Sequence, residues 1–241
     1  MEDAMPGLKI LVDSLEQIEP LNQEARAAIL SADCVVRSYA AGRYVLREND
    51  RADFIGIAIE GFAFSHKQTS SGSRQILSLI LPGEALALEN IYLNQLDCSI
   101  QALTTFSVGL IHRDAMKRFM MLHPTIANGI STMLAYRSSI YKEWMLNIGR
   151  RNAKERVGHL LCEIAVRLTG GNTTADRSFK FPLTQEQIGD ALGLTAAHVN
   201  RAMKSLRNEG LLIREKTLFR LPEWDALCVL ADFNDEYLTN E

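Results

Sequence analysis

Two short helical patterns, residues 185–192 and 196–208, stand almost back to back in the sequence. Thr184 and Thr195 come directly before them, where a hydroxyl side chain caps the first free N–H groups of a helix. Gly193 lies between the two patterns, at a helix end where a left-handed backbone conformation favours glycine. A corner this short that contains glycine is typical of a helix-turn-helix.

The second pattern has one apolar face and one polar face. Its inward side chains are Val199, Ala202, Met203 and Leu206. On the outward face, Arg can bond guanine O6 and N7 together, Asn can do the same for adenine, and alanine methyls can contact thymine methyls. An ordinary helical corner with a solvated basic face is the alternative interpretation. The predicted DNA-contacting residues are Thr184, Gln185, Thr195, Ala196, Ala197, His198, Asn200, Arg201 and Lys204.

The segment that follows extends this prediction. After Gly210, "LLIREKTLFRL" is typical of two strands turning at Glu215-Lys216, which would form a wing. Residues 150–220 carry 13 Lys+Arg and 7 Asp+Glu, a charge of +6, whereas the rest of the chain carries −9. A positive third within an acidic protein favours a polyanion-binding module, although a solvated surface of mixed charge can give the same division.

The whole-chain composition is that of an ordinary globular protein, with 47% apolar and 23% charged residues in 241. No apolar run approaches the roughly 18–20 residues of a membrane span, and the first residues carry acids where a secretory signal has Lys or Arg. We therefore expect a cytoplasmic protein without a membrane partner. The four cysteines have no C-x-x-C spacing, which argues against a zinc site and a disulfide framework and favours small buried hydrophobes.

Short β-type runs recur between residues 34 and 111, and Gly42, Gly61, Gly72 and Gly83 separate several of them. Many short strands with glycine turns are typical of a barrel or jelly roll. The predicted strands are residues 34–39, 44–46, 54–59, 62–67, 75–81, 99–104 and 106–111.

After residue 112 the pattern becomes helical. A short helix over residues 113–121 stops before Pro124, and a long helix follows over residues 125–149. The apolar stripe of the long helix exceeds what one small β domain can cover, so we predict a dimer seam; packing of the helix wholly on its own β domain is the alternative. The predicted seam residues are Ile126, Ile130, Met133, Ile140, Trp144 and Ile148.

A capping-box pair, Asn152 and Glu155, marks the start of the next helix, over residues 153–168. The chain is thus predicted to be an α+β protein. Residues 1–112 would form a β-roll, residues 113–150 linker and dimerisation helices, and residues 151–241 a winged helix-turn-helix.

These features together resemble the Crp/Fnr (cyclic-AMP receptor protein / fumarate–nitrate regulator) family of transcription regulators. The likeness covers roughly residues 20–235 and is most specific in "LTQEQIGDALGLTAAHVNRAMKSLRNEGLL"; "LPGEALALE" and "DCSIQALT" carry it less specifically. It implies an N-terminal jelly-roll β-barrel of the cyclic-nucleotide-binding type and a homodimer joined along the long helix. It also implies a roughly palindromic DNA operator and, since the family mostly activates transcription, RNA polymerase as a partner.

The resemblance also assigns base contacts to the early part of the second helix. Positions that read bases in the family correspond here to Ala196, Ala197, Asn200 and Arg201. The family usually keeps Arg at the position of Arg201. Well-known members carry a Glu that reads a C·G pair at the position of Ala197, so the target of this chain should differ at that base pair. His198, next to Ala197, is a candidate replacement contact.

The β-roll sequence does not favour a cyclic-nucleotide effector. No Lys or Arg stands between Arg74 and Arg113, and a buried phosphate without a cation is costly. Gly83-Glu84 resembles half of the family's nucleotide motif but comes too early. Only Cys34 lies in the first 97 residues, which argues against an iron–sulfur cluster. We therefore predict no cofactor and leave the effector unassigned.

Other chemistry receives little support from the sequence. His66, His112, His123 and Cys98 could ligate a haem iron, and Cys98 could act as a redox switch, but ordinary buried or exposed side chains are the simpler interpretation. There is no H-x-H pair, Walker loop, G-x-S-x-G or H-E-x-x-H, so neither a metal site nor catalysis is expected.

The sequence therefore predicts a homodimeric, sequence-specific DNA-binding transcription regulator, with activation the more expected outcome. The β-roll would bias a hinge near residues 147–152. The alternative is a protein-interaction module whose winged helix no longer reads DNA.

Overall fold

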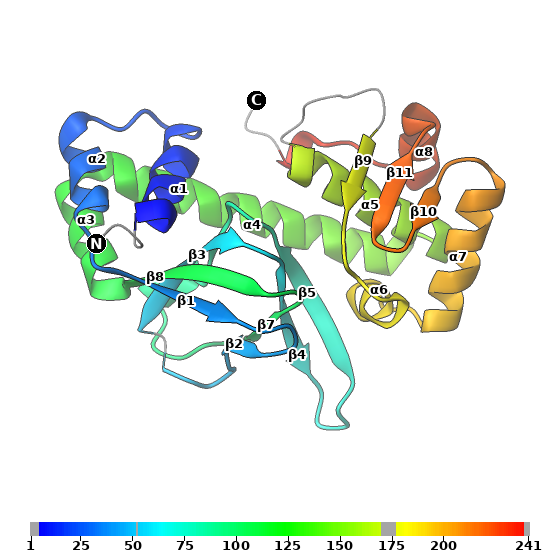
Figure 1. The fold of residues 1–241 in the computed structure, drawn as a ribbon, viewed down its shortest axis with the longest axis horizontal. Helices are drawn as coiled ribbons and strands as arrows, with labels where there is room; N and C mark the ends of the chain where they lie inside the picture. Colours follow the sequence, from blue (N-terminus) through cyan, green and yellow to red (C-terminus); the bar gives the residue numbers. More distant parts are fainter. Residues whose placement is uncertain (1–4, 52, 170–176, 239–241) are drawn as a thin grey trace. The chain divides into compact units, whose positions relative to one another are not determined.

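The computed structural model describes residues 5–51, 53–169 and 177–238, and Figure 1 shows the order of their elements. The chain divides into two compact units, one of residues 1–68 and 77–138 and the other of residues 69–76 and 139–241. This division falls inside the long helix, whereas the sequence suggested a boundary at residue 150. Among the described residues, no helix combines the length and the apolar character needed to cross a bilayer.

The first unit contains the predicted jelly roll. Its strands form two four-stranded sheets, ordered β1-β8-β3-β6 and β2-β7-β4-β5. The core between the sheets includes Ala58, Ile100, Phe106 and Val108. Of these strands, only the short β6 was not predicted. Their bounds are β1 Cys34–Tyr39, β2 Tyr44–Leu46, β3 Phe54–Glu60, β4 Ala63–Gln68, β5 Arg74–Ile80, β6 Ala85–Leu86, β7 Ser99–Ala102 and β8 Phe106–His112.

Helices cover the sheet that contains β3 and β8. The first two of these helices were not predicted, although Leu8, Leu11 and Leu15 have a helical spacing. These leucines are buried with Ile55 and Ile57 of β3 in a second core. The helical elements of this unit are α1 Met5–Glu16, α2 Gln23–Leu30, the 3₁₀ turn η2 Leu88–Ile91, α3 Arg113–Leu122 and the first part of α4 Pro124–Arg150.

Three of the six predicted seam residues of α4 are buried within the chain. Ile126 and Ile130 are fully buried in the core with α1 and β3, and Met133 packs against the same core. Trp144 is 5% exposed, and its indole N–H donates to the Glu163 carboxylate over 2.8 Å. This part of the stripe therefore packs within the chain, partly on the β domain and partly on α5, while Ile140 and Ile148 stay half-buried. A dimer seam along these residues stays a prediction.

The second unit contains the winged helix-turn-helix and the end of α4. Its three-stranded sheet has the order β10-β11-β9, and β10 and β11 form the predicted wing with Lys216 in the turn at a φ of 55°. Gln185–Leu192 and Ala196–Asn208 coincide with the predicted helices. The elements are α5 Ala153–Thr169, β9 Arg177–Lys180, α6 Gln185–Leu192, α7 Ala196–Asn208, β10 Ile213–Glu215, β11 Leu218–Leu221, α8 Trp224–Ala231 and the 3₁₀ turn η3 Glu236–Leu238.

A buried carboxylate ties several of these elements together. Glu163 of α5 is fully buried and accepts hydrogen bonds from the Trp144 indole of α4, over 2.8 Å, and from the Tyr237 hydroxyl of η3, over 3.0 Å. Arg167, one turn further along α5, pairs with the same carboxylate at 2.8 Å. A buried carboxylate with this many donors is stable only because its charge and its oxygens are matched.

Candidate nucleic-acid interface

Local capping fixes both helices of the helix-turn-helix. The Thr184 hydroxyl accepts a hydrogen bond from the Gln187 N–H, and the Gln187 side chain accepts one from the Thr184 N–H, which completes a capping box. Gly193 ends α6 in the left-handed conformation, with a φ of 63°. The Thr195 hydroxyl then caps α7 by accepting from the His198 N–H. The corner is thus determined by residues within the corner itself.

Packing inside the corner sets the rotation of α7. Ile188 and Leu192 of α6 and Val199 and Leu206 of α7 are all at most 2% exposed. A side chain at Gly189 would meet the Leu194 carbonyl oxygen at 2.4 Å, so the backbone of the turn packs directly against α6. With one face held in this way, the opposite face of α7 must point outward.

The outward face of α7 carries most of the predicted contact residues. Ala196, Ala197, Asn200, Arg201 and Lys204 are exposed, as are Thr184, Thr195 and His198, whereas Gln185 is half-buried. Neither Asn200 nor Arg201 is drawn into the interior. The arrangement combines small side chains at the helix N-terminus with amide and guanidinium groups one turn further on, as direct reading of base edges requires.

Two of these side chains also contact neighbours. The Asn200 amide donates to the Gln185 side-chain oxygen over 3.2 Å. The Nδ1 atom of His198 lies 2.8 Å from the Thr195 hydroxyl. These bonds bring α6 and α7 side chains to one surface and hold the His198 ring at the helix N-terminus, with Nε2 as its remaining polar atom.

Arg214 is half-buried and bonded within the wing, although it contributes to the positive charge counted for residues 150–220. Its guanidinium donates to the Leu183 and Lys216 carbonyls over 3.2 and 3.0 Å and lies 4.8 Å from the Phe219 ring centroid. Burial lowers the pKa of Arg214. This cation therefore stabilises the wing and should not be counted among DNA contacts.

The connection between α4 and α5 is rigidly bonded within the second unit. Asn152 caps α5 as predicted, with its side-chain oxygen accepting from the Lys154 and Glu155 N–H groups. Arg151 is 7% exposed and pairs with Glu143 of α4 at 2.6 Å and with Asp232 after α8 at 3.0 Å. Arg151 thus links the predicted hinge at residues 147–152 to α4 and to the segment after α8. The role of this segment as a hinge stays a prediction.

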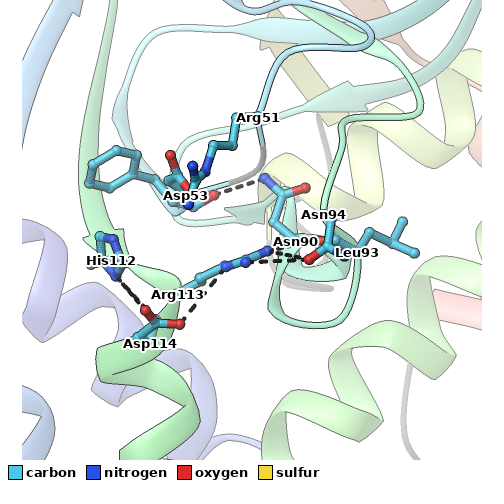
Figure 2. A network of polar contacts seen from close by, with 9 residues as sticks. Arg51, Asp53, Asn90, Leu93, Asn94, His112, Arg113 and Asp114 are labelled. Atoms are coloured by element: carbon cyan, nitrogen blue, oxygen red, sulfur yellow. Dashed lines mark hydrogen bonds and ion pairs between the residues drawn. The ribbon is translucent and has the colours of Figure 1, made fainter.

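The β-roll has a polar pocket of about 920 Å³. Its cations are Arg51, Lys67 and Arg113, which the sequence analysis of residues 75–112 could not find because they come from other segments. Figure 2 shows the Arg113 guanidinium reaching the Leu93 carbonyl, over 2.7 Å. Arg51 bonds Asp53 at 2.8 Å and Lys67 pairs with Glu48 at 3.5 Å. All three cations are therefore already engaged by the chain, and the absence of a cyclic-nucleotide effector stays a prediction.

Glu84 and His112, which were candidates for nucleotide and haem binding, make hydrogen bonds to neighbouring backbone groups. Glu84 closes the turn that contains Gly83 by accepting from the Leu81 N–H over 3.1 Å. His112 caps α3, with Nδ1 accepting from the Asp114 N–H.

Cys98 lies in an acidic environment. Its sulfur and the carboxylates of Glu89 and Asp97 lie within 4.8 Å of one another, and Arg137 pairs with Glu89 at 3.3 Å. Burial and the neighbouring Asp97 raise the pKa of Cys98 to about 12. The redox switch considered for Cys98 therefore loses support, because a thiol held protonated is a poor nucleophile.

A protein that turns an arginine, an asparagine and small side chains outward from the second helix of a winged helix-turn-helix is a DNA-binding regulator. Residues 155–230 match the Crp-like helix-turn-helix domain, and residues 36–123 match the cyclic nucleotide-binding domain. The chain belongs to the Crp/Fnr family of transcription regulators.

Individual relatives agree with this assignment. The transcriptional activator protein FnrL of Cereibacter sphaeroides is 29% identical over 182 residues, which cover 74% of this chain and 73% of FnrL. The nitrogen fixation regulation protein FixK of Rhizobium meliloti is 26% identical over 206 residues, covering 85% and 91%. The structure of FixK2 from Bradyrhizobium japonicum matches with a TM-score of 0.76 at 27% identity, covering 82% of this chain and 97% of FixK2.

Proposed function

We propose that the chain acts as a homodimeric transcriptional activator that places α7 in the DNA major groove and reads a roughly palindromic operator. The observation that carries the proposal is the division of α7 into a buried apolar face and an exposed face with Asn200, Arg201 and Lys204. Two such helices related by a two-fold axis would enter successive major grooves, about 34 Å apart.

Each exposed side chain has a distinct proposed role. Arg201 reads guanine and Asn200 reads adenine, while Ala196 and Ala197 contact thymine methyls. Lys204 neutralises a phosphate. The Thr184 hydroxyl, which accepts a cap hydrogen bond, still has its own hydrogen to donate to a phosphate oxygen.

Arg201→Ala is expected to weaken binding to a selected operator by about 1–3 kcal/mol, or roughly 5- to 150-fold, for each half-site, and to relax the preference at one base pair per half-site. The matched control is Lys204→Ala, which should weaken binding to all sequences alike and lower the salt slope by about 1 for each subunit, or about 2 for the dimer. The measurement is fluorescence-anisotropy titration of the operator and its single-base variants at several salt concentrations. An equal loss on every duplex would make Arg201 a phosphate contact.

The same titration separates DNA reading from the alternative of a protein-interaction module. A sequence reader should prefer operators obtained by in-vitro selection over random duplexes by about 10³-fold or more and show a steep loss of affinity with salt. Failure of selection to enrich any sequence would favour the interaction module. We propose no catalytic role, a cytoplasmic location, and RNA polymerase as the protein partner at the promoter.

The dimer seam is proposed on a different face of α4 from that suggested by the sequence. A second stripe runs along α4 beside the predicted one, from Ser131 to Met145, at alternating steps of three and four residues. All of its side chains are exposed or half-buried. The C-terminal part of this stripe is apolar, with Tyr141 at 36% and Met145 at 73% exposure. The steps match the 3.5-residue repeat of paired helices, and the small serines would allow close approach. The stripe is formed by Ser131, Leu134, Ser138, Tyr141 and Met145.

Met145→Glu is expected to split the homodimer, because a carboxylate would have to be buried between two apolar helix faces. The control is Val229→Glu, which places the same charge on a side chain that is 84% exposed on α8. Light scattering at micromolar concentration should give half the dimer mass for Met145→Glu and the full dimer mass for the control. A Met145→Glu protein that stays dimeric would refute this seam.

A further inference from the structure

Two cysteines that are far apart in the sequence meet between α5 and α8. Cys162 is fully buried in α5 and Cys228 is half-buried in α8, and both are free thiols. The two thiols lie close enough that each changes the pKa of the other. The sequence interpretation of these cysteines as isolated hydrophobes therefore misses a contact that only the fold creates.

The packing of the two helices explains the contact. Gly158 lies one turn before Cys162, and a side chain there would come within 3.1 Å of the Ala231 Cβ and 3.3 Å of the Leu227 Cδ1. The absence of that side chain lets α5 and α8 approach closely. One turn further along α5, Cys162 lies beside Cys228, which is three residues before Ala231 in α8.

The surroundings make the two thiols unequal. The hydrogen bond from Cys162 and the charge of Arg177 lower the pKa of Cys228, against the opposing effects of its partial burial and of two nearby aspartates. Burial raises the pKa of Cys162. Arg177 is held in place over the Trp224 ring, with its guanidinium carbon 3.5 Å from the ring centroid. Cys228 is thus the more nucleophilic sulfur, and Cys162 is the protonated partner beside it.

We propose that Cys162 and Cys228 form a redox-active dithiol, which a hydroperoxide converts into a disulfide between α5 and α8. The Cys228 thiolate attacks the peroxide oxygen, the O–O bond breaks, and the alcohol (water from hydrogen peroxide) leaves after taking up a proton. This step forms the Cys228 sulfenic acid. The Cys162 sulfur then attacks the Cys228 sulfur, the S–O bond breaks, and water leaves with the thiol proton. The two sulfurs lose two electrons, and the peroxide gains them.

The test oxidises the full-length reduced protein with a stoichiometric amount of hydrogen peroxide and then alkylates it in denaturant. Untreated protein should take up a label on each of its four cysteines. The oxidised protein should lose two labels and about 2 Da, with trypsin releasing residues 157–167 cross-linked to residues 221–241. This chemistry is independent of DNA binding, so its outcome and that of the operator titrations do not affect each other.

Cys228→Ser is the matched control, since it keeps the polar contact to Cys162 but removes the proposed nucleophile. It should form no cross-link and keep its Cys162 label; Cys162→Ala should also form no cross-link. Circular dichroism before and after oxidation checks that the wild-type protein stays folded. Additions of about 16 Da on Cys228 with Cys162 still labelled, or disulfides between two chains, would overturn the proposal.

Discussion

Glu163→Leu is expected to destabilise the second unit by about 3–5 kcal/mol. The fully buried Glu163 carboxylate accepts from the Trp144 indole and the Tyr237 hydroxyl and pairs with Arg167, whose side chain is 9% exposed. Leucine would deprive a buried guanidinium of this carboxylate and remove the acceptor of two further donors. Urea unfolding followed by far-UV circular dichroism measures the loss directly.

Two further substitutions provide the comparison, one that removes a single donor to Glu163 and one that removes an exposed carboxylate. Tyr237→Phe removes one donor and should cost about 1–3 kcal/mol, less than the loss of the whole carboxylate. Glu209→Gln removes an exposed carboxylate that bonds Lys154 and Ser205, and it should change stability little. If Glu163→Leu unfolded at the same urea concentration as Glu209→Gln, the buried carboxylate would not hold α4, α5 and η3 together.

Gly189→Ala should disrupt the helix-turn-helix and abolish high-affinity operator binding. The added Cβ would lie 2.4 Å from the Leu194 carbonyl oxygen. That oxygen belongs to the backbone of the corner, which also donates a hydrogen bond from the Leu194 N–H to the Gly189 carbonyl. Since neither group can move without opening the corner, we expect a cost of about 3 kcal/mol and a displaced α7.

The control for this substitution is Gly149→Ala. Gly149 is also helical, but a Cβ there has no atom within 4 Å, so alanine should stabilise α4 by roughly 0.5–1 kcal/mol. Thermal unfolding and operator titration of the two variants provide the comparison. Gly189→Ala protein with wild-type melting temperature and operator affinity would show that the corner tolerates a side chain.

The helix-turn-helix could be predicted closely because its signals are local. Thr184, Gly193 and Thr195 act on groups within a few residues of themselves, and the observed bounds of α6 and α7 are those predicted. The glycine-separated strands were recognisable for the same reason. In contrast, α1 and α2 received no assignment, although the leucine spacing of α1 was visible.

The sequence alone could not show which face of α4 is already covered within the chain. The stripe through Ile126 and Ile130 is the more apolar one, but it is buried by α1 and β3 within the chain. The stripe through Tyr141 and Met145 contains small and polar residues and carries a weaker signal. Helical periodicity reveals both stripes, and only packing shows which one is already covered.

The sequence by itself determined the β-roll, the long helix and the outward chemistry of α7, because turns, caps and side-chain periodicity depend on neighbours in the chain. Only the tertiary structure decided that Arg214 is bonded to the Leu183 carbonyl, that Glu163 accepts hydrogen bonds from α4 and η3, and that Cys162 lies beside Cys228. These contacts join residues far apart along the chain. Their distances follow from how helices and strands pack, which no local pattern specifies.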